Sequence, residues 1–335
     1  MKRIKLPFIM GLEVEFADRD RGLKQIKEFA ERGTWYPIVV FGPEGCGKTS
    51  WLRAGVEILR DLGFSVIYFN PLRRDFLVEV GIKSVEERAL EILKHASTIH
   101  ILAGFIGYVI DFARDIIKLG KEKIAVIVDD VFELTGVQEA SLFVKGMLEL
   151  IEHPPEKYEK IVAIAATSEG FSRREIGKHR WAELRSMWNM SKRGFRELYE
   201  EIPGFKLEFE DVWRLTGGNP DVFRKLYQAD WSIERVIHEF IVNKEITRSF
   251  IEKWRSWLEI AIEDPDSLWG VDIPSELIEE LISKNLIVYN MYSRDPWFWI
   301  DEPPLERDLE LGIGKYIAWQ SPLHREAVRR ALIIQ

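Results

Sequence analysis

The chain has 335 residues, of which 46% are hydrophobic and 30% are charged, and its formal net charge is −8. This length exceeds one ordinary domain and predicts two, or two plus a small one. The acidic balance excludes broad coating of nucleic acid, which requires a surplus of Lys and Arg, and leaves a local basic patch open. The single cysteine, Cys46, excludes an internal disulfide, so we expect a reducing, cytoplasmic location.

No stretch of the sequence is predicted to enter a membrane. Residues 1–7 lack the apolar core and the small-residue cleavage site of a signal peptide. The most hydrophobic window, residues 99–110, is interrupted by His100 and has about twelve residues, whereas a helix that spans a bilayer requires about twenty. We therefore expect this window to form a buried helix.

The first predicted elements alternate between helix and strand. Apolar spacing predicts a short amphipathic helix over residues 22–32, and residues 38–41 form an apolar β-type run. That run ends in a glycine-rich turn, which continues into a second helix that Gly63 terminates. Residues 64–69 are then a second strand, which Asn70-Pro71 ends.

The middle of the chain continues this alternation. Residues 84–119 are predicted to be mostly helical, and residues 123–128 form a near-continuous apolar strand, of the kind that is covered on both faces in a parallel sheet. A helix over residues 139–151 and a buried strand over residues 161–166 follow. Strands that alternate with helices predict a right-handed, doubly wound parallel sheet, with ligands at the carboxyl ends of its strands.

From Ser191 onward the pattern changes to helices. A break over residues 216–220 interrupts them, and helical spacing then continues to about residue 258. The remaining predicted elements are a helix over residues 277–282, short strands over residues 285–289 and 297–300, and a helix over residues 322–332.

The strand over residues 38–41 leads into the pattern G-x-x-x-x-G-K-T, which is typical of a phosphate-binding loop when a strand precedes it and a helix follows. Its glycines allow the backbone to curl with N–H groups inward, Lys48 reaches the β- and γ-phosphates, and Thr49 binds Mg²⁺. The alternative is a chance glycine-rich turn. The predicted nucleotide-binding residues of this loop are Gly42, Pro43, Glu44, Gly45, Cys46, Gly47, Lys48, Thr49 and Ser50.

A second group of candidate residues follows the strand over residues 123–128. Hydrolysis requires a carboxylate that holds Mg²⁺ at the end of a strand beside the loop strand, and we expect Asp129 in that place. Asp130 is the candidate catalytic residue that polarises the attacking water. The alternative role of Asp130 is a helix cap or a surface turn. Glu133 is a weaker candidate for polarising the attacking water.

Polar and basic residues follow the strand over residues 161–166. Thr167 or Ser168 is predicted to contact the γ-phosphate or the water, although both residue types are common in loops after strands. A basic cluster comes next, made of Arg173, Arg174, Lys178, His179 and Arg180. We expect one arginine, Arg173, to stabilise the transferring phosphoryl group. The alternative is a solvated or nucleic-acid-facing patch.

Four segments together resemble the archaeal ATPase family, a group of P-loop proteins close to the AAA+ and STAND ATPases and related to archaeal replication initiators. They are Phe16-Ala17-Asp18-Arg19-Asp20, the Walker A loop from Gly42 to Thr49, Val126-Ile127-Val128-Asp129-Asp130, and Thr216-Gly217-Gly218-Asn219-Pro220. The loop and the acidic residue at the strand end are shared by all P-loop NTPases. The Gly-Gly-Asn-Pro turn narrows the resemblance to this family. The resemblance covers most of the chain.

The resemblance implies an α/β fold, in which a P-loop core with a parallel five-stranded sheet of order 5-1-4-3-2 is followed by a helical lid and a C-terminal winged helix. We expect these parts over residues 1–190, 191–260 and 261–335. The resemblance also implies that Asn219 and Pro220 lie against the adenine of ATP. Asp18 and Arg19 are then expected to cover the base from the other side.

The chain departs from the family pattern at two points. Many AAA+ proteins have Asp-Glu where this chain has Asp129-Asp130, which puts fast hydrolysis in doubt. The lid also lacks an arginine directly after its Gly-x-x opening, and Arg224 comes later. The arginine that contacts the γ-phosphate is therefore left open among Arg173, Arg174, Arg180 and Arg224.

The expected winged helix has an acidic helix where DNA recognition would require a basic one. Residues 276–284 carry three glutamates and one lysine, which is a poor surface for a phosphate backbone. We therefore favour a protein partner or self-association through this domain. DNA binding is left open through Arg294, Arg307, Arg325, Arg329 and Arg330.

The leading functional hypothesis is an enzyme that binds ATP with Mg²⁺, hydrolyses ATP to ADP and phosphate, and moves its lid and winged helix with the nucleotide state. The alternative, from another class of protein, is a switch or scaffold that binds ATP tightly and hydrolyses it slowly or not at all. A small-molecule kinase is less favoured, because no motif for an acceptor pocket is evident.

Overall fold

The computed structural model describes residues 4–70, 75–79, 81, 83, 86–87, 99–130, 132–167, 173 and 176–334, and for residues 76, 99–107 and 132–140 it describes the backbone alone. Within these ranges the chain forms two compact units. The first comprises residues 1–19, 42–47 and 186–335, and the second comprises residues 20–41 and 48–185. Each unit is therefore assembled from segments that are separate in the sequence.

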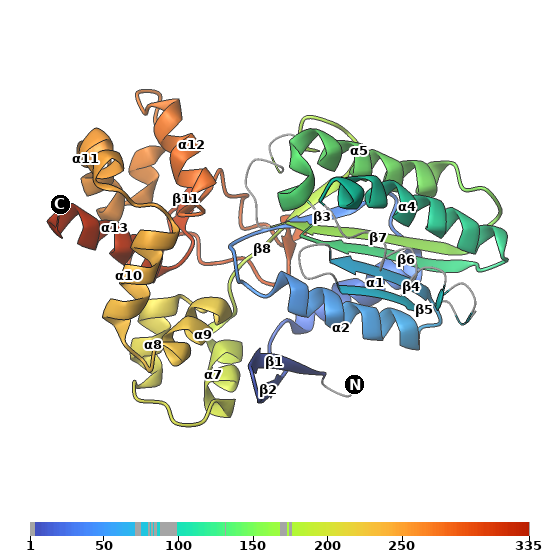
Figure 1. Ribbon diagram of the computed structural model, residues 1–335, viewed down its shortest axis with the longest axis horizontal. Helices are drawn as coiled ribbons and strands as arrows, with labels where there is room; N and C mark the ends of the chain where they lie inside the picture. Colours follow the sequence, from blue (N-terminus) through green and yellow to red (C-terminus); the bar gives the residue numbers. More distant parts are fainter. Residues whose placement is uncertain are drawn as a thin grey trace. The chain divides into compact units, whose positions relative to one another are not determined.

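The second unit is an α/β structure in which parallel strands are joined by helices. Its strands are apolar along nearly their whole length, so both faces of the sheet have to be covered. Figure 1 shows α4 and α5 on one face of the sheet and α1 and α2 on the other. The elements are α1 (Asp20–Arg32), β3 (Ile38–Phe41), α2 (Lys48–Asp61), β4 (Ser65–Asn70), β5 (Asp75–Glu79), α4 (Ile99–Lys118), β6 (Lys123–Asp129), α5 (Phe132–Glu152), β7 (Lys160–Thr167) and β8 (Glu183–Met187).

The central sheet has the order β10-β8-β3-β7-β6-β4-β5. Neighbouring strands among β3, β7, β6 and β4 are parallel, whereas β5 pairs antiparallel with β4. β8 crosses from the second unit into the first, where Ser186 and Met187 pair in parallel with β10 (Trp299–Ile300). The resemblance implies five strands, whereas the described residues form a sheet of seven, because β5 and β10 extend it at its two edges.

The core of the second unit lies between the sheet and the helices that cover it. Val39, Val126 and Ala163 come from three strands of the sheet, and together with Ile116 of α4 and Val144 of α5 they have no exposed surface. Burying each of the larger of these side chains contributes about 1.5–3 kcal/mol. The strand ends that carry polar residues are therefore held by a tightly packed layer.

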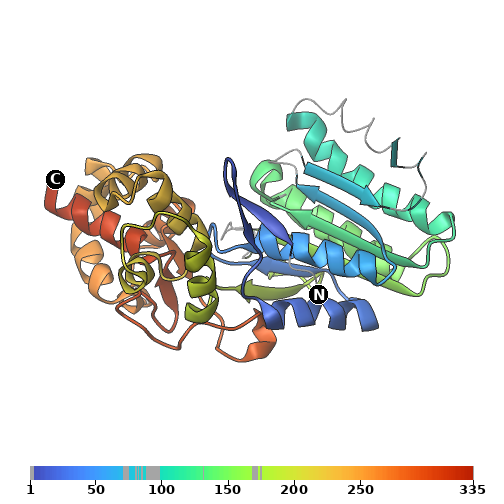
Figure 2. The ribbon, with the colours of Figure 1, turned by 90° about the horizontal axis from the view of Figure 1, so that it is seen from below.

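The first unit begins with a β-hairpin that the sequence pattern does not predict. β1 (Lys5–Ile9) and β2 (Leu12–Glu15) pair antiparallel around a turn at Gly11, whose φ is 80°. Each strand buries only one side chain, Phe8 or Val14, and the alternation of apolar and charged residues from Leu12 to Glu15 is only four residues long, which is a weak signal. These two side chains pack with Phe195, and the hairpin lies beside α7 (Figure 2).

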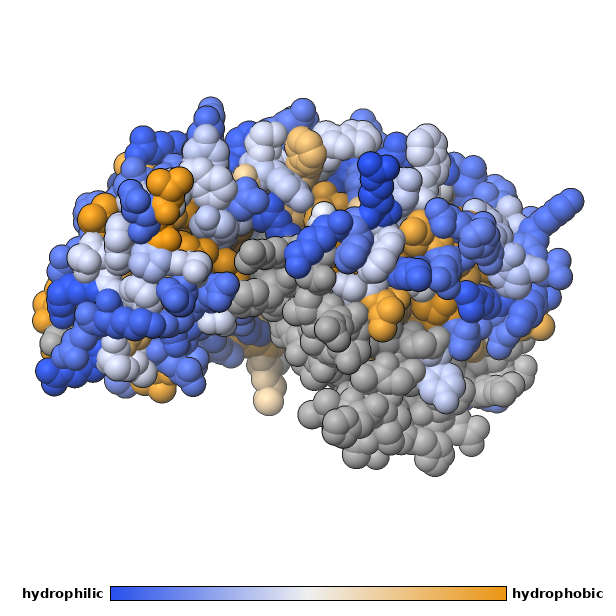
Figure 3. Space-filling view, turned by 90° about the horizontal axis from the view of Figure 1, so that it is seen from above, coloured by the Kyte–Doolittle hydropathy of each residue, from blue (hydrophilic) through white to orange (hydrophobic). Residues whose placement is uncertain are grey.

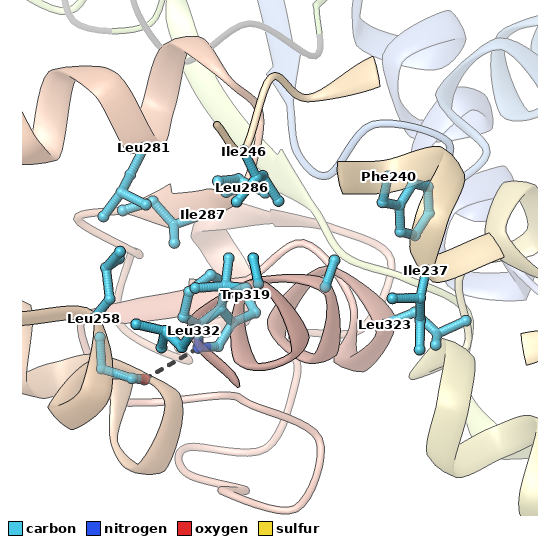
Figure 4. Packing of buried hydrophobic residues seen from close by; sticks show 14 of the residues in the cluster. Ile237, Phe240, Ile246, Leu258, Leu281, Leu286, Ile287, Trp319, Leu323 and Leu332 are labelled. Carbon is cyan, nitrogen blue, oxygen red and sulfur yellow. Dashed lines mark hydrogen bonds between the residues drawn. The ribbon is translucent and has the colours of Figure 1, made fainter. Parts of the chain in front are cut away.

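Helices form most of the rest of the first unit. A buried cluster formed by α9 to α13 surrounds Trp319, whose indole Nε1 donates to the Ala261 carbonyl oxygen at 3.2 Å (Figure 4). The elements are α7 (Lys192–Glu201), α8 (Phe209–Thr216), α9 (Pro220–Gln228), α10 (Ile233–Asn243), α11 (Arg248–Glu263), η1 (Pro265–Leu268), α12 (Ser275–Ser283), β9 (Ile287–Tyr289), η2 (Pro296–Phe298), β11 (Ile317–Trp319) and α13 (Pro322–Ile334).

The predicted strand over residues 297–300 is wrong for half of its length. Trp297 and Phe298 belong to the 3-10 helix η2, and only Trp299 and Ile300 are extended, as β10. The antiparallel partner of β9 is β11, which lies much later in the sequence. The run of bulky apolar residues thus indicates a short strand without identifying the strand that pairs with it.

Among the described residues, no helix is both long enough and apolar enough to span a bilayer. The window over residues 99–110 forms the first part of α4, in which Val109 and Ile110 are buried. On the face drawn in Figure 3, hydrophilic residues predominate and hydrophobic ones are scattered among them.

Candidate nucleotide site

The glycine-rich loop follows β3 directly, and the close approach of other segments explains two of its glycines. A Cβ at Gly42 would overlap the carbonyl oxygen of Met187. Gly45 has a φ of 74°, and a Cβ there would overlap the Cβ of Asp221. Only glycine therefore fits at both positions. The loop backbone also closes on itself, because the Cys46 N–H donates to the Pro43 carbonyl oxygen at 3.2 Å.

Three side chains from elsewhere in the first unit hold peptide groups of this loop. The Oε1 of Gln320 accepts the Glu44 N–H at 2.8 Å. The Nδ2 of Asn219 donates to the Glu44 carbonyl oxygen at 2.9 Å, and the Nη2 of Arg19 donates to the Cys46 carbonyl oxygen at 2.7 Å. The direction of each of these peptide groups is therefore set by a side chain outside the loop.

Asn219 and Pro220 form the start of α9. The Oδ1 of Asn219 accepts the backbone N–H groups of Asp221 and Val222, both at 3.1 Å, and so caps the helix. Its Nδ2 also donates to the Oδ1 of Asn189 at 3.0 Å. Pro220 takes the first helical position, where a missing N–H costs nothing. The turn for which the resemblance implies adenine contact thus contacts the phosphate loop through Asn219.

Asp18 and Arg19 have the same left-handed backbone, each with a φ of 66°. The Asp18 carboxylate accepts both the N–H and the hydroxyl of Ser191, each at 2.8 Å, at the start of α7. Arg19 is 2% exposed, and besides the Cys46 carbonyl it binds the Trp188 carbonyl and the carboxylate of Asp301. The two residues expected to cover the base are therefore engaged in contacts within the first unit.

Lys48, Thr49 and Ser50 open α2 in the second unit. Lys48 is buried, and Thr49 and Ser50 are half-buried. At the first turn of a helix the backbone N–H groups lack carbonyl partners and carry a partial positive charge. This position therefore suits a polyphosphate, as the sequence motif predicts.

Asp129 ends β6 and is fully buried. Its Oδ2 accepts hydrogen bonds from the Tyr68 hydroxyl at 3.0 Å and from the Asn70 Nδ2 at 2.9 Å. Burial, and then the negative charge of Asp129, raise the pKa of Tyr68, so the phenol stays protonated and donates. The Oδ1 has no hydrogen-bond partner in the part of the chain that the structure describes.

This arrangement fits a hard cation. A buried carboxylate oxygen without a partner costs free energy unless it binds a cation or water. Mg²⁺ takes one or two protein oxygens and completes its shell with water and phosphate oxygens. Asp129, together with the Thr49 hydroxyl, would supply these ligands, and the ion would neutralise phosphate charge. The described residues contain no larger group of His, Cys, Asp and Glu that could hold a metal.

The strand of Asp129 is not beside the loop strand, which corrects one expectation. β7 lies between β3 and β6, with Phe41 opposite Thr167 and Ala166 opposite Asp129. The parallel register nevertheless brings the ends of β3, β7 and β6 to one edge of the sheet, about 10 Å across at the usual strand spacing. Thr167, at the end of the intervening strand, is fully buried.

Asp130 directly follows β6 with a left-handed φ of 52°. Its N–H donates to the Ala166 carbonyl oxygen at 3.0 Å, and its Oδ2 lies 3.5 Å from the Nδ2 of Asn70. Asn70 therefore bridges the two carboxylates that the sequence assigns to metal binding and to water activation. A left-handed aspartate is uncommon, and such backbone strain is concentrated at functional sites.

The candidate arginines are placed differently from one another. The Arg173 guanidinium lies 4.2 Å from the ring centroid of Phe41, the residue before Gly42. Arg180 is exposed, and Arg224 pairs with Asp221 on α9 while its buried Nε has no partner among the described residues. Ser168 and Arg174 lie outside the part of the chain that the structure describes.

The sequence pattern misses several residues of the site. In the sequence, Asn70 indicates only the end of a strand. Asn70 lies two residues after Tyr68, however, so both side chains lie on one face of β4. Tyr68 also accepts a hydrogen bond from Arg53, which pairs with Asp75 on β5. Gln320 and Lys244 contact Glu44, but no motif or pattern in the neighbouring sequence marks either residue as part of the site.

The five arginines considered for DNA binding are all engaged within the chain. Arg294 donates to the carbonyl oxygens of Tyr292, Leu305, Glu306 and Gly314. Their other partners are Asp264 for Arg307, the carbonyl oxygens of Leu309 and Glu310 for Arg325, Glu263 and Glu326 for Arg329, and Glu234 for Arg330.

The parallel sheet and the strand, loop and helix that carry G-x-x-x-x-G-K-T define a nucleotide-binding protein of the P-loop class. Residues 16–226 match a family model described as an ATPase domain predominantly from Archaea. This match covers more than half of the chain, and the protein belongs to that family. No curated protein matches the chain.

Solved structures with similar folds are distant in sequence. A replication initiator DnaA bound to AMPPCP and single-stranded DNA is 17% identical, with a TM-score of 0.39 and coverage of 77% of this chain and 72% of that chain. AMPPCP-bound DnaA from Aquifex aeolicus is 16% identical, with a TM-score of 0.36 and coverages of 77% and 74%. Drosophila ORC bound to DNA is 15% identical, with a TM-score of 0.37 and coverages of 98% and 88%.

Proposed function

We propose that the protein is an ATPase that binds ATP with Mg²⁺ at its glycine-rich loop and hydrolyses it to ADP and phosphate. The backbone N–H groups of Gly45, Gly47, Lys48 and Thr49 and the ammonium of Lys48 bind the phosphates. Thr49 and Asp129 hold Mg²⁺, Asp130 orients the attacking water, and Arg173 stabilises charge on the γ-phosphate. On this proposal, strands β8, β3, β7, β6 and β4 are strands 5, 1, 4, 3 and 2 of the core that the resemblance implies.

We further propose that the nucleotide state controls a helical lid, over residues 191–260, and a winged-helix-like domain, over residues 261–335. One observation carries this proposal: all three polar groups of Glu44 are bound by residues from those two parts. The N–H binds Gln320, the carbonyl oxygen binds Asn219, and the carboxylate binds Lys244. If a bound phosphate rearranges the loop, it therefore changes the contacts that the loop makes with the lid and with the C-terminal domain.

The alternative is a switch that binds ATP and hydrolyses it slowly or not at all. Two observations favour it over a fast enzyme. Asp130 is one methylene shorter than a glutamate in the same place, so its carboxylate reaches less far toward a water. Asn70 also lies within 3.5 Å of that carboxylate and competes for it. Both functions require the same bound nucleotide.

Steady-state phosphate release distinguishes these functions. We compare the native chain with Lys48→Ala, which removes the phosphate-binding charge, and Asp130→Ala, which removes the candidate base. The ATPase proposal expects Mg²⁺-dependent release from the native chain and a large loss in both variants. If calorimetry detects ATP binding but the native chain releases no more phosphate than Lys48→Ala, the protein is the switch and not the enzyme.

We also propose a protein partner or self-association for the C-terminal domain rather than DNA. The arginines available for phosphate contacts there are paired within the chain, and α12 is acidic. Binding to mixed duplex DNA is therefore expected to stay undetectable at low salt with ATP present. Measurable binding under those conditions would reverse this choice.

A further inference from the structure

Arg19 joins three segments of the first unit with one guanidinium group. Its Nη2 donates to the carbonyl oxygens of Cys46 and Trp188, both at 2.7 Å, and its Nη1 donates to the Oδ2 of Asp301 at 3.2 Å. The side chains of Arg19 and Asp301 are 3% and 5% exposed. Only arginine presents several donors in a fixed planar fork, so lysine could not reproduce this set of contacts.

The contact with Cys46 determines the direction of a neighbouring N–H group. The C=O of Cys46 and the N–H of Gly47 belong to one planar peptide group, and the described chain contains no cis peptide bond. In a trans peptide these two bonds point in opposite directions. Because Arg19 binds the carbonyl oxygen, the Gly47 N–H points away from Arg19. Gly47, with a φ of 101°, can adopt the backbone that this orientation requires.

The register of β10 explains how Asp301 reaches Arg19. Ile300 pairs with Met187 in the parallel ladder between β10 and β8. Asp301 and Trp188 are the next residues of these two segments, so both emerge together where the ladder ends. Arg19 binds across the two emerging segments, to the carboxylate of one and to the carbonyl oxygen of the other.

Both members of the ion pair have unfavourable backbones. The φ of Asp301 is 65°, close to the 66° of Arg19, and neither residue is glycine. Such conformations persist where surrounding contacts hold them, and they are concentrated at functional sites. A buried ion pair is also a poor device for stability alone, because apolar replacements of similar volume are often as stable. The pair therefore calls for a role beyond holding the fold together.

We propose that Arg19 is a positioning residue of the phosphate loop, and that Asp301 on the C-terminal segment holds it in place. By fixing the Cys46–Gly47 peptide group, Arg19 keeps the Gly47 N–H turned toward the side on which the phosphates bind. This inference rests on the proposed function, because it assigns a task to residues that serve the same loop. It also makes the C-terminal strand β10 a part of the nucleotide site.

The test compares ATP and ADP affinity, measured by calorimetry, with thermal stability in the full chain. Arg19→Lys keeps the charge and loses the fork, and Asp301→Asn leaves Arg19 in place without its counter-ion. Both variants are expected to bind nucleotide roughly tenfold to a hundredfold more weakly, as the loss of a hydrogen bond to a charged group implies. Arg185→Lys is the matched control, because Arg185 is also buried and also pairs with a carboxylate, that of Glu183.

A double variant separates positioning from stability. Arg19→Met with Asp301→Leu replaces the buried ion pair with apolar side chains, so its melting temperature is expected to return to near the native value. Its nucleotide affinity is expected to stay as low as that of the single variants. Native-like affinity in the double variant, or in Arg19→Lys, would overturn the inference. Failure of the native chain to bind ATP would instead overturn the proposed function.

Discussion

The Nζ of Lys244 lies 2.5 Å from the Oε2 of Glu44, and 200 residues separate the two in the sequence. Lys244 is the residue that ends α10, and Glu44 lies in the glycine-rich loop. The helical region therefore contacts the loop through a charged pair, in addition to the hydrogen bond from Asn219.

Breaking this pair is expected to loosen the loop more than it destabilises the protein. Lys244→Met and Glu44→Gln should each lower the free energy of unfolding by less than about 1 kcal/mol, because Glu44 is half-exposed. Hydrogen exchange of the backbone amides of residues 44–47 in nucleotide-free protein should become several-fold faster. Lys253→Met, which breaks an exposed pair with Glu280, is the control and should leave this exchange unchanged. Unchanged exchange in Lys244→Met would show that the pair does not restrain the loop.

Asn70→Ala is expected to change catalysis rather than nucleotide affinity. Asn70 donates to Asp129 and lies near Asp130, the two carboxylates that we assign to the metal and to the attacking water. Losing a hydrogen bond to a carboxylate costs about 1.5–3 kcal/mol, which corresponds to roughly tenfold or more in the rate of phosphate release. Asn243→Ala, on the exposed end of α10, is the control. An unchanged release rate in Asn70→Ala would exclude a part for this amide in hydrolysis.

Asp129→Asn is expected to remove the magnesium dependence of nucleotide binding. The Oδ1 of Asp129 is the buried acceptor that we assign to Mg²⁺, and an amide is a much poorer ligand for this ion. The rise in melting temperature caused by ATP should therefore be larger with Mg²⁺ than without it in the native chain, and equal in the variant. Asp111→Asn, at an exposed acid of α4, should behave as the native chain does. A magnesium effect retained in Asp129→Asn would place the ion elsewhere.

His324 predicts a dependence of stability on pH. Burial, and then the positive charges of Lys244 and Lys225, lower the pKa of His324 to about 3 in the folded protein. Its ring stacks on Phe240, and its Nδ1 lies 2.8 Å from the Ser321 hydroxyl. Between pH 6.5 and 3 the unfolded chain binds a proton at this position and the folded chain does not. The free energy of unfolding therefore falls as the pH falls through this range.

The size of this effect can be isolated with His324→Gln. Relative to the variant, the native chain should lose about 2 kcal/mol of stability between pH 7 and pH 5, at about 1.4 kcal/mol per pH unit below 6.5. Denaturant unfolding at the two pH values measures the difference. The exposed His238 supplies the control, as His238→Gln. Equal losses in the native chain and in His324→Gln would contradict the buried, neutral histidine.

The sequence predicts those parts of the site that depend on local pattern. The strand before Gly42, the helix that begins at Lys48 and the aspartate that ends β6 all lie where their apolar runs and glycines indicate. These features are encoded within a few residues, by hydrophobic periodicity and by the backbone freedom of glycine. The order of strands does not follow from such patterns, and the intervening position of β7 is a property of the whole sheet.

The contacts between distant segments could not be predicted from the same signals. Gln320 and Glu44 are 276 residues apart, and Arg19 and Asp301 are 282 apart. Neither Gln320 nor Asp301 belongs to a motif, and only the folded chain identifies the residues that they contact. The two residues of β10 likewise indicate only extended backbone, because a run of bulky apolar residues does not specify which strand it joins.

Residues 42–47 belong to the same unit as residues 186–335, although the strand before them and the helix after them belong to the other unit. During synthesis the loop leaves the ribosome long before the residues that hold it, because Gln320 lies 276 residues after Glu44 and Asp301 lies 282 residues after Arg19. A nascent or prematurely terminated chain would therefore carry the Walker motif without the side chains that orient it. Tight binding of ATP is therefore expected only in chains that extend beyond Gln320, so products that end before this residue would compete weakly for the nucleotide.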